Sequence, residues 1–191
     1  LFFGLSHAML LYGQRAKTIG IESGFDPENL YVIYNSLDYA AQKALRDKIT
    51  REDIKRVRGE LFNASNYPLV VCVGRLIKDR KLALLLDASS HLLKGGHMIN
   101  ILLIGDGSER LALQADAEKR MLSVNFYGAC YDEGILSRLI MASNVVVMPG
   151  NVGLTAIHSL SYGIPVISHN NANQQMPEWE AITPGLTGDL F

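Results

Sequence analysis

The feature that most constrains the fold is a series of five short apolar runs separated by segments with helical spacing. The runs are Leu69 to Gly74, Ile99 to Gly105, Val124 to Gly128, Asn144 to Pro149 and Pro165 to Ser168. Each is apolar on successive residues, without the polar alternation of a half-exposed strand, which is typical of parallel strands covered on both faces. One strand and one helix in about every 20 to 30 residues predicts an α/β fold with a doubly wound parallel sheet.

Two of the intervening segments carry clear helix signals. Leucines between residues 82 and 93 form one apolar stripe, which ends at Gly95. A second stripe over residues 135–140 follows Asp132, a residue that commonly caps the start of a helix. These helices are expected to cover the sheet.

The first 65 residues are less regular. They contain a possible strand at residues 31–35 and a charged segment, residues 39–61, that predicts one helix. Turn-forming residues at 63–68 precede the first long apolar run. We therefore expect an entry segment, residues 1–65, followed by the main sheet domain, residues 66–191.

Composition and charge exclude several classes of protein. The chain is 48% hydrophobic and 19% charged with a net charge of -1, which is typical of a soluble globular domain and gives no attraction to nucleic acid. The densest basic stretch, Lys48 to Arg58, also contains acids and predicts a solvated helix face. The apolar opening, residues 1–13, is interrupted by Gly4 and His7 and is shorter than the ~20 residues of a membrane helix. It is neither a span nor a signal peptide.

The cysteines and histidines do not indicate a metal centre or a disulfide framework. Cys72 and Cys130 lie in or beside apolar runs, which favours free thiols in a reducing cytoplasm. The chain has no His-x-x-x-His, Cys-x-x-Cys or Asp-x-Asp pattern and no Gly-x-Ser-x-Gly elbow. We therefore expect no metal and no hydrolase triad.

Cations cluster after the first apolar run, where an open parallel sheet binds its ligands. Arg75, Lys78, Arg80 and Lys81 lie between the end of this strand and the start of the next helix. Cations at a helix start oppose the helix dipole, and a bound diphosphate would remove that conflict. A solvated basic turn is the alternative, and the residues alone do not decide between them.

Glycine-bearing turns follow two other strands. The turn that contains Gly107 resembles part of a dinucleotide motif, but a tight turn with Ser108 as helix cap is the favoured interpretation. The loop from Gly150 precedes a helix predicted from Leu154 to Tyr162, so that backbone N–H groups could face an anion. His158 lies one turn into this helix, where it could reach a ligand hydroxyl, although a lone helix histidine is more often structural.

Five segments, in order, resemble the C-terminal domain of group 1 retaining glycosyltransferases, also called family 4, which have the two-domain GT-B architecture. They are VIYNSLD, VGRLIKDRK, LIGDGSE, VNFYG and MPGNVGLTAIHSLSYGIPVI, and the resemblance extends from Tyr31 to the end of the chain. It implies a Rossmann-like domain that binds a nucleotide-sugar donor, in a chain that is part of a longer protein with a separate N-terminal acceptor domain.

The resemblance also assigns roles to residues. It implies that the donor diphosphate is bound by Arg75, Arg80, Lys81, Gly153, Leu154 and Thr155. It implies that the sugar or nucleoside is contacted by Gly107, Cys130, Gly150, Asn151, Val152 and His158. The catalytic residues are unknown and are expected mainly in the N-terminal domain, so that this chain alone should bind a donor without turning it over.

The chain departs from the family at two positions. The family usually has two glutamates with seven residues between them, and these positions are Gly150 and His158 here. The first glutamate commonly contacts the donor sugar, and the second accepts from ribose hydroxyls, which a neutral His158 could also do. The pattern around these positions, with Gln175 to Glu178 after it, is similar to a subgroup of bacterial polysaccharide enzymes.

The function implied by the resemblance is transfer of a hexose-type sugar to a glycan or lipid-linked acceptor in polysaccharide or lipopolysaccharide biosynthesis. Retention of the anomeric configuration is expected, without a metal or other cofactor. A cytoplasmic location, with the parent protein at the inner face of the membrane, is compatible with this function by analogy. Two alternatives stay open, a nucleotide-sugar 2-epimerase and a non-catalytic nucleotide-binding or scaffold module.

Overall fold

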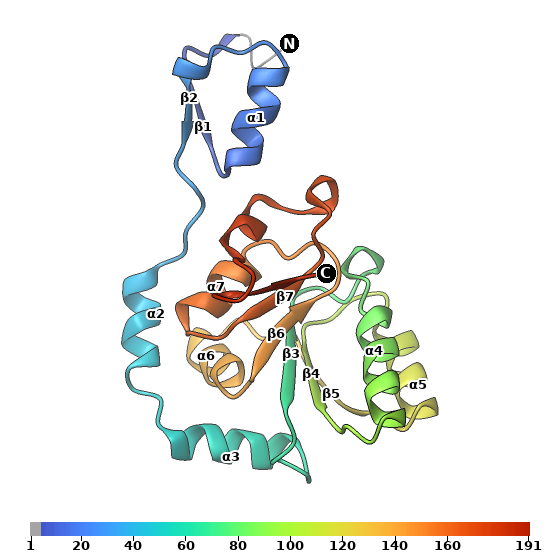
Figure 1. The fold of residues 1–191 in the computed structure, drawn as a ribbon. Coiled ribbons are helices and arrows are strands. Elements are labelled where there is room, and N and C mark those ends of the chain that lie inside the picture. Colours follow the sequence, from blue (N-terminus) through green and yellow to red (C-terminus); the bar gives the residue numbers. More distant parts are fainter. Residues whose placement is uncertain (1–4) are drawn as a thin grey trace.

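The computed structural model describes residues 5–191 and contains a small β–α–β unit and a larger sheet domain (Figure 1). In the small unit, β1 (Met9–Leu11) and β2 (Leu30–Val32) pair in parallel and are connected through α1 (Gln14–Glu22) and the 3₁₀ turn Pro27–Asn29. Figure 1 shows an extended segment that leads from β2 toward the sheet domain. The small unit also contacts this domain directly, because the backbone N–H groups of Gln14 and Arg15 donate to the Glu180 carboxylate. The predicted strand at residues 31–35 therefore exists, but it begins and ends earlier.

The opening of the chain contributes to this small unit. Residues 1–4 lie outside the described part, and the rest of the apolar opening includes β1. No helix within residues 5–191 is long and apolar enough to cross a membrane.

The predicted single helix over residues 39–61 is wrong, because the structure has two helices there. These are α2 (Tyr39–Arg46) and α3 (Arg51–Leu61). Thr50 caps α3 by accepting from the backbone N–H of Asp53, and Asp53 accepts in return from the backbone N–H of Thr50. This reciprocal capping box satisfies two amide groups at a new helix start, and it therefore separates the two helices. Both helices pack on α6.

The main sheet contains six strands, one more than the five predicted. Their order is β5-β4-β3-β6-β7-β8, and all neighbouring strands are parallel. The strands are β3 (Leu69–Val73), β4 (Asn100–Ile104), β5 (Ser123–Gly128), β6 (Val145–Met148), β7 (Val166–Ser168) and β8 (Gly188–Leu190). The unpredicted strand β8 begins at Gly188, where a Cβ would lie 1.8 Å from the carbonyl oxygen of Val166. Only glycine permits this pairing distance.

Helices cover both faces of the sheet, as expected for a doubly wound fold. They are α4 (Ala83–Lys94), α5 (Arg110–Lys119), α6 (Glu133–Met141) and α7 (Thr155–Ser161). Figure 1 shows α4 and α5 on one side of the sheet and α6 and α7 on the other. Val71 and Leu102, which are paired in the middle of the neighbouring strands β3 and β4, are fully buried, which explains the unbroken apolar runs.

Most predicted helix boundaries are confirmed. Asp132 accepts a hydrogen bond from the backbone N–H of Ile135 at the start of α6, and α4 ends at Gly95. The expectation that Ser108 caps the next helix is wrong, because α5 has Glu109 at its N-cap position and no side-chain cap there.

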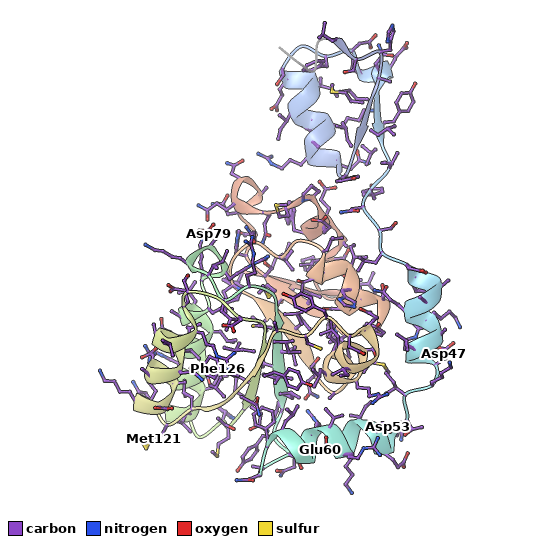
Figure 2. The ribbon with its side chains drawn as sticks, turned by 180° about the vertical axis from the view of Figure 1, so that it is seen from behind. Asp47, Asp53, Glu60, Asp79, Met121 and Phe126 are labelled. Carbon is purple, nitrogen blue, oxygen red and sulfur yellow. The ribbon has the colours of Figure 1, made fainter. Side chains whose placement is uncertain are left out.

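The order of the strands creates a switch point between β3 and β6. From β3 the chain moves to β4 and β5 on one side, and it then crosses back to β6 and β7 on the other. Loops after β3 and β6 therefore diverge and leave a crevice at the carboxyl ends of these strands, which is where open α/β sheets bind ligands. Figure 2 shows Asp79, from the loop after β3, at this end of the domain and Met121 at the opposite end.

Candidate functional site

The ends of β3 and β4 approach each other through two glycines. Gly74 and Gly105 have φ angles of 141° and 146°, in the region that favours glycine. A Cβ on Gly105 would lie 1.9 Å from the carbonyl oxygen of Gly74. This contact holds the two loops together and exposes backbone at the carboxyl edge of the sheet.

Arg80 lies at the switch point between β3 and β6. It belongs to the 3₁₀ turn Lys78–Arg80, and its guanidinium donates to the carbonyl oxygen of Asn151, in the loop after β6. Atoms of the same guanidinium lie 3.9 Å from the Cβ position of Gly74, at the end of β3. Burial lowers the pKa of Arg80, and the nearby Arg75 guanidinium lowers it further.

The two guanidinium groups lack a balancing carboxylate. Within residues 5–191, neither Arg75 nor Arg80 forms a salt bridge. The Asp79 carboxylate acts on Arg80 only at longer range and partly offsets the lowering of its pKa. Two cations held close together and partly desolvated favour an anionic ligand between them.

Gly150 brings the loop after β6 against the turn Lys78–Arg80. Its N–H donates to the carbonyl oxygen of Arg80 at 2.9 Å. A Cβ on Gly150 would lie 2.0 Å from the carbonyl oxygen of Asp79 and 2.7 Å from the Cα of Arg80. The glutamate that the family usually has here therefore has no space in this chain, and the predicted sugar contact of Gly150 could involve only backbone.

The start of α7 offers amide groups to the same crevice. Thr155 Oγ1 donates to the carbonyl oxygen of Val73 at 3.1 Å, which fixes the first turn of α7 beside the end of β3. Among the described residues, the N–H groups of Gly153, Leu154 and Thr155 have no hydrogen-bond acceptor. The N–H of Val152 is already used, because it donates to Gln175 Oε1 at 2.9 Å.

Two cavities are lined by residues that lie next to Arg80, Gly74 in one and Asn151 in the other. The first, about 250 Å³, is lined by Arg75 and Cys130 together with Val73, Gly74, Ile104, Gly105, Asp106, Ala129 and Tyr131. The second, about 330 Å³, is lined by Asp79, Lys81, Asn151, His169 and Gln174. The structure thus places Arg75 and Cys130 in one cavity and Lys81 and Asn151 in the other.

Sequence reasoning missed three residues of the second cavity, namely Asp79, His169 and Gln174. His169 follows β7 directly, so the rule that selected residues after the other strands would have selected it too. Asp79 was not predicted as a site residue, because the four cations around it indicated an anion-binding turn. Gln174 carried no signal, because it lies in a short 3₁₀ turn that the sequence did not predict.

His158 points toward α6. Its Nε2 lies 2.7 Å from Glu133 Oε1, and the hydroxyl of Tyr162 donates to the same carboxylate oxygen. Burial raises the pKa of Glu133, but hydrogen bonds from Tyr162, His158 and Gln42 outweigh it and hold the pKa below its usual value. His158 lines neither of the two cavities, and only its Nδ1 is left for the predicted contact with a ribose hydroxyl.

Gly107 also lies outside both cavities. A Cβ there would lie 2.4 Å from the carbonyl oxygen of Leu76, so this glycine allows the loop after β4 to pack on the loop after β3. Its contact with a donor stays a prediction. No group of three metal-ligating side chains occurs within residues 5–191.

Comparison with known proteins agrees with this geometry. The family model for glycosyl transferases group 1 matches residues 53–185, which is more than half of the chain. The chain belongs to this family. The match includes β3 to β7 and the loops that build both cavities, so the resemblance seen in the sequence segments is confirmed.

Individual relatives support the assignment. This group 1 chain is 29% identical over 176 residues to glycogen synthase of Halorhodospira halophila, covering 86% of the chain and 35% of the relative. Its fold matches that of Anabaena HepE, solved with UDP and glucose, with a TM-score of 0.73, 23% identity and coverage of 97% and 49%. It also matches WaaG, a glycosyltransferase involved in lipopolysaccharide biosynthesis, with a TM-score of 0.70, 15% identity and coverage of 95% and 48%. The chain thus spans about a third to a half of these proteins, and its fold is consistent with the C-terminal domain of GT-B enzymes.

Proposed function

We propose that this chain binds the diphosphate of a nucleotide-sugar donor in the crevice between β3 and β6. The observation that carries the proposal is a pair of nearby guanidinium groups, from Arg75 and Arg80, together with the open amide groups at the start of α7, which Thr155 holds beside the end of β3. A diphosphate accepts charge-assisted hydrogen bonds from both kinds of donor. The fold of HepE, which was solved with UDP and glucose, supports a donor of this class.

The whole protein would then transfer a hexose-type sugar from this donor to a glycan or lipid-linked acceptor, with retention of configuration. The guanidinium groups and amides would stabilise the charge that develops on the departing diphosphate. The proposal includes no metal, because the guanidinium and amide groups of the protein would balance the charge of the diphosphate both when the donor is bound and when the diphosphate leaves. The match to the group 1 family favours transfer over 2-epimerisation and over a non-catalytic module.

Calorimetric titration of the chain with uridine, guanosine and adenosine diphosphates tests the proposal. We expect one of them to bind, and we expect Arg75→Ala to weaken this binding by about 1.5 to 3 kcal/mol, or roughly 10- to 150-fold. Arg138→Ala is the matched control, because Arg138 is an exposed arginine near the end of α6 and should leave the affinity unchanged. Absence of binding with all three nucleotides, or equal affinity of Arg75→Ala and the unchanged chain, would contradict the proposal.

A further inference from the structure

The cavity of about 330 Å³ next to Arg80 has its own set of polar groups. Asn151 lines it, and the carbonyl oxygen of Asn151 accepts from the Arg80 guanidinium. The cavity therefore begins where the proposed diphosphate site ends. An inference about the ligand of this cavity rests on the proposed function, because a donor whose diphosphate is bound by Arg75 and Arg80 places its sugar beyond the second phosphate.

His169 presents a buried donor to this cavity. The side chain is only 8% exposed, and its Nδ1 accepts from the backbone N–H of Asn171 at 3.1 Å. Since Nδ1 is the acceptor, the proton of the neutral ring must lie on Nε2. Burial lowers the pKa of His169, and the Lys81 ammonium lowers it further, which keeps the ring neutral near pH 7.

The Nε2 atom of His169 is buried and has no hydrogen-bond partner within the described residues. A buried N–H without an acceptor is unfavourable, and such groups in native proteins usually have a partner. The ring is also held in place, because the backbone of Asn171 fixes its tautomer. His169 is thus a preorganised donor without a protein acceptor, and it lines a cavity whose ligand can supply one.

Lys81 supplies a cation to the same cavity from an unfavourable backbone conformation. Its φ angle is 51°, in the left-handed region, which a lysine rarely adopts. Its Nζ donates to Gln174 Oε1 at 2.7 Å, so the side chain is oriented along the cavity wall. Backbone strain of this kind tends to occur at functional sites, and here it places an ammonium group beside the His169 ring.

The charge of the cavity favours an anion. Lys81 is in the lining, Arg80 donates to its wall, and Lys78 lies in the same turn, whereas Asp79 is the single acid of the five lining residues. The position where the family usually has a sugar-binding glutamate is Gly150, which has no space for a side chain. The usual acceptor for sugar hydroxyls is therefore replaced by an N–H donor and an ammonium group.

We propose that this cavity binds the sugar of the donor and that this sugar carries a carboxylate, as a hexuronic acid does. One carboxylate oxygen accepts from His169 Nε2–H, and the Lys81 ammonium neutralises its charge. A carboxylate has only acceptors, so it matches these two donors, whereas a neutral hexose would leave the ammonium without an anionic partner.

The experiment compares glucose and glucuronic acid conjugates of whichever nucleoside diphosphate binds the chain. We expect the glucuronic acid conjugate to bind at least about tenfold more tightly than the glucose conjugate. His169→Phe keeps a planar ring but removes the donor, so the preference should fall to less than about threefold while affinity for the nucleoside diphosphate stays unchanged. His169→Gln retains an N–H at a similar distance from the backbone and should keep the preference.

Lys81→Asn provides an independent variant, because asparagine tolerates the left-handed conformation and removes the charge. It should also abolish the preference. Equal affinity for the two conjugates would overturn the inference and leave the proposed function intact, since the diphosphate would still bind. Loss of nucleoside diphosphate affinity in His169→Phe would also overturn it, because His169 would then contact a phosphate. If no nucleoside diphosphate binds, both proposals fail.

Discussion

Replacing Gly150 with alanine tests whether the site depends on close contact between the loop after β6 and the turn Lys78–Arg80. The added Cβ would lie 2.0 Å from the carbonyl oxygen of Asp79 and 2.7 Å from the Cα of Arg80, both of which are backbone atoms. Backbone cannot rotate away as a side chain can, so the two loops must separate. Such overpacking destabilises a protein by about 1 to 3 kcal/mol.

For a chain of this length, a loss of this size lowers the melting temperature by roughly 2 to 12 °C. The shift also strains the hydrogen bond from Gly150 N–H to the Arg80 carbonyl and moves the Arg80 guanidinium. We therefore expect weaker binding of the nucleoside diphosphate together with lower stability. Gly150→Glu, which restores the residue typical of the family, should be at least as destabilising.

Equilibrium unfolding in urea measures the stability, and Gly59→Ala is the matched control. Gly59 lies within α3, and a Cβ there would meet nothing within 4 Å. This substitution should raise the free energy of unfolding by about 0.5 to 1 kcal/mol, because alanine favours a helix over glycine. If Gly150→Ala is as stable as the unchanged chain while Gly59→Ala behaves as expected, the steric argument at Gly150 is refuted.

Three further predictions concern other parts of the domain. Lys81→Gly should be more stable to urea than Lys81→Ala by about 1 kcal/mol, because glycine adopts the left-handed φ of 51° without strain. Equal stabilities of the two variants would show that the backbone at residue 81 is not strained. In maleimide labelling of the native chain, Cys130 should react much faster than Cys72, because burial raises the pKa of the Cys72 thiol, and a bound nucleoside diphosphate should protect Cys130. Folding lowers the pKa of Glu133, so its contribution to stability is present above its unfolded pKa and is lost as pH falls through the folded pKa. Glu133→Gln should therefore lose less stability than the unchanged chain as the pH is lowered from about 5, and identical acid profiles would show that the interactions of Glu133 do not stabilise the fold.

The sequence alone was sufficient for the fold class and for most of the strands. Parallel strands buried on both faces need unbroken apolar runs, and such a run can be recognised from a few consecutive residues. Helix ends with strong local signals, such as Asp132 and Gly95, were also predictable, because a cap acts within one turn. The rule that ligands bind beyond the carboxyl ends of strands then directed attention to Arg75, Arg80 and Gly150.

Some local features were missed although a signal was present. Thr50 and Asp53 have the spacing of a capping box, yet the charged pattern on both sides of them suggested one continuous helix. Strand β8 has only three residues and begins with glycine, so it resembles a turn until it pairs with β7. In both cases the signal covers too few residues to be distinguished from the pattern of the neighbouring residues.

Tertiary structure alone decided the chemistry of the site. The order of the strands, the contact of Gly150 with a turn 70 residues earlier, and the buried N–H of His169 each depend on segments that are distant in sequence. Local sequence determines which element forms, because helix and strand patterns are set by neighbouring residues. Which groups meet in a cavity, and which donor is left without an acceptor, depends on how those elements pack, and that is determined only when the whole chain is folded.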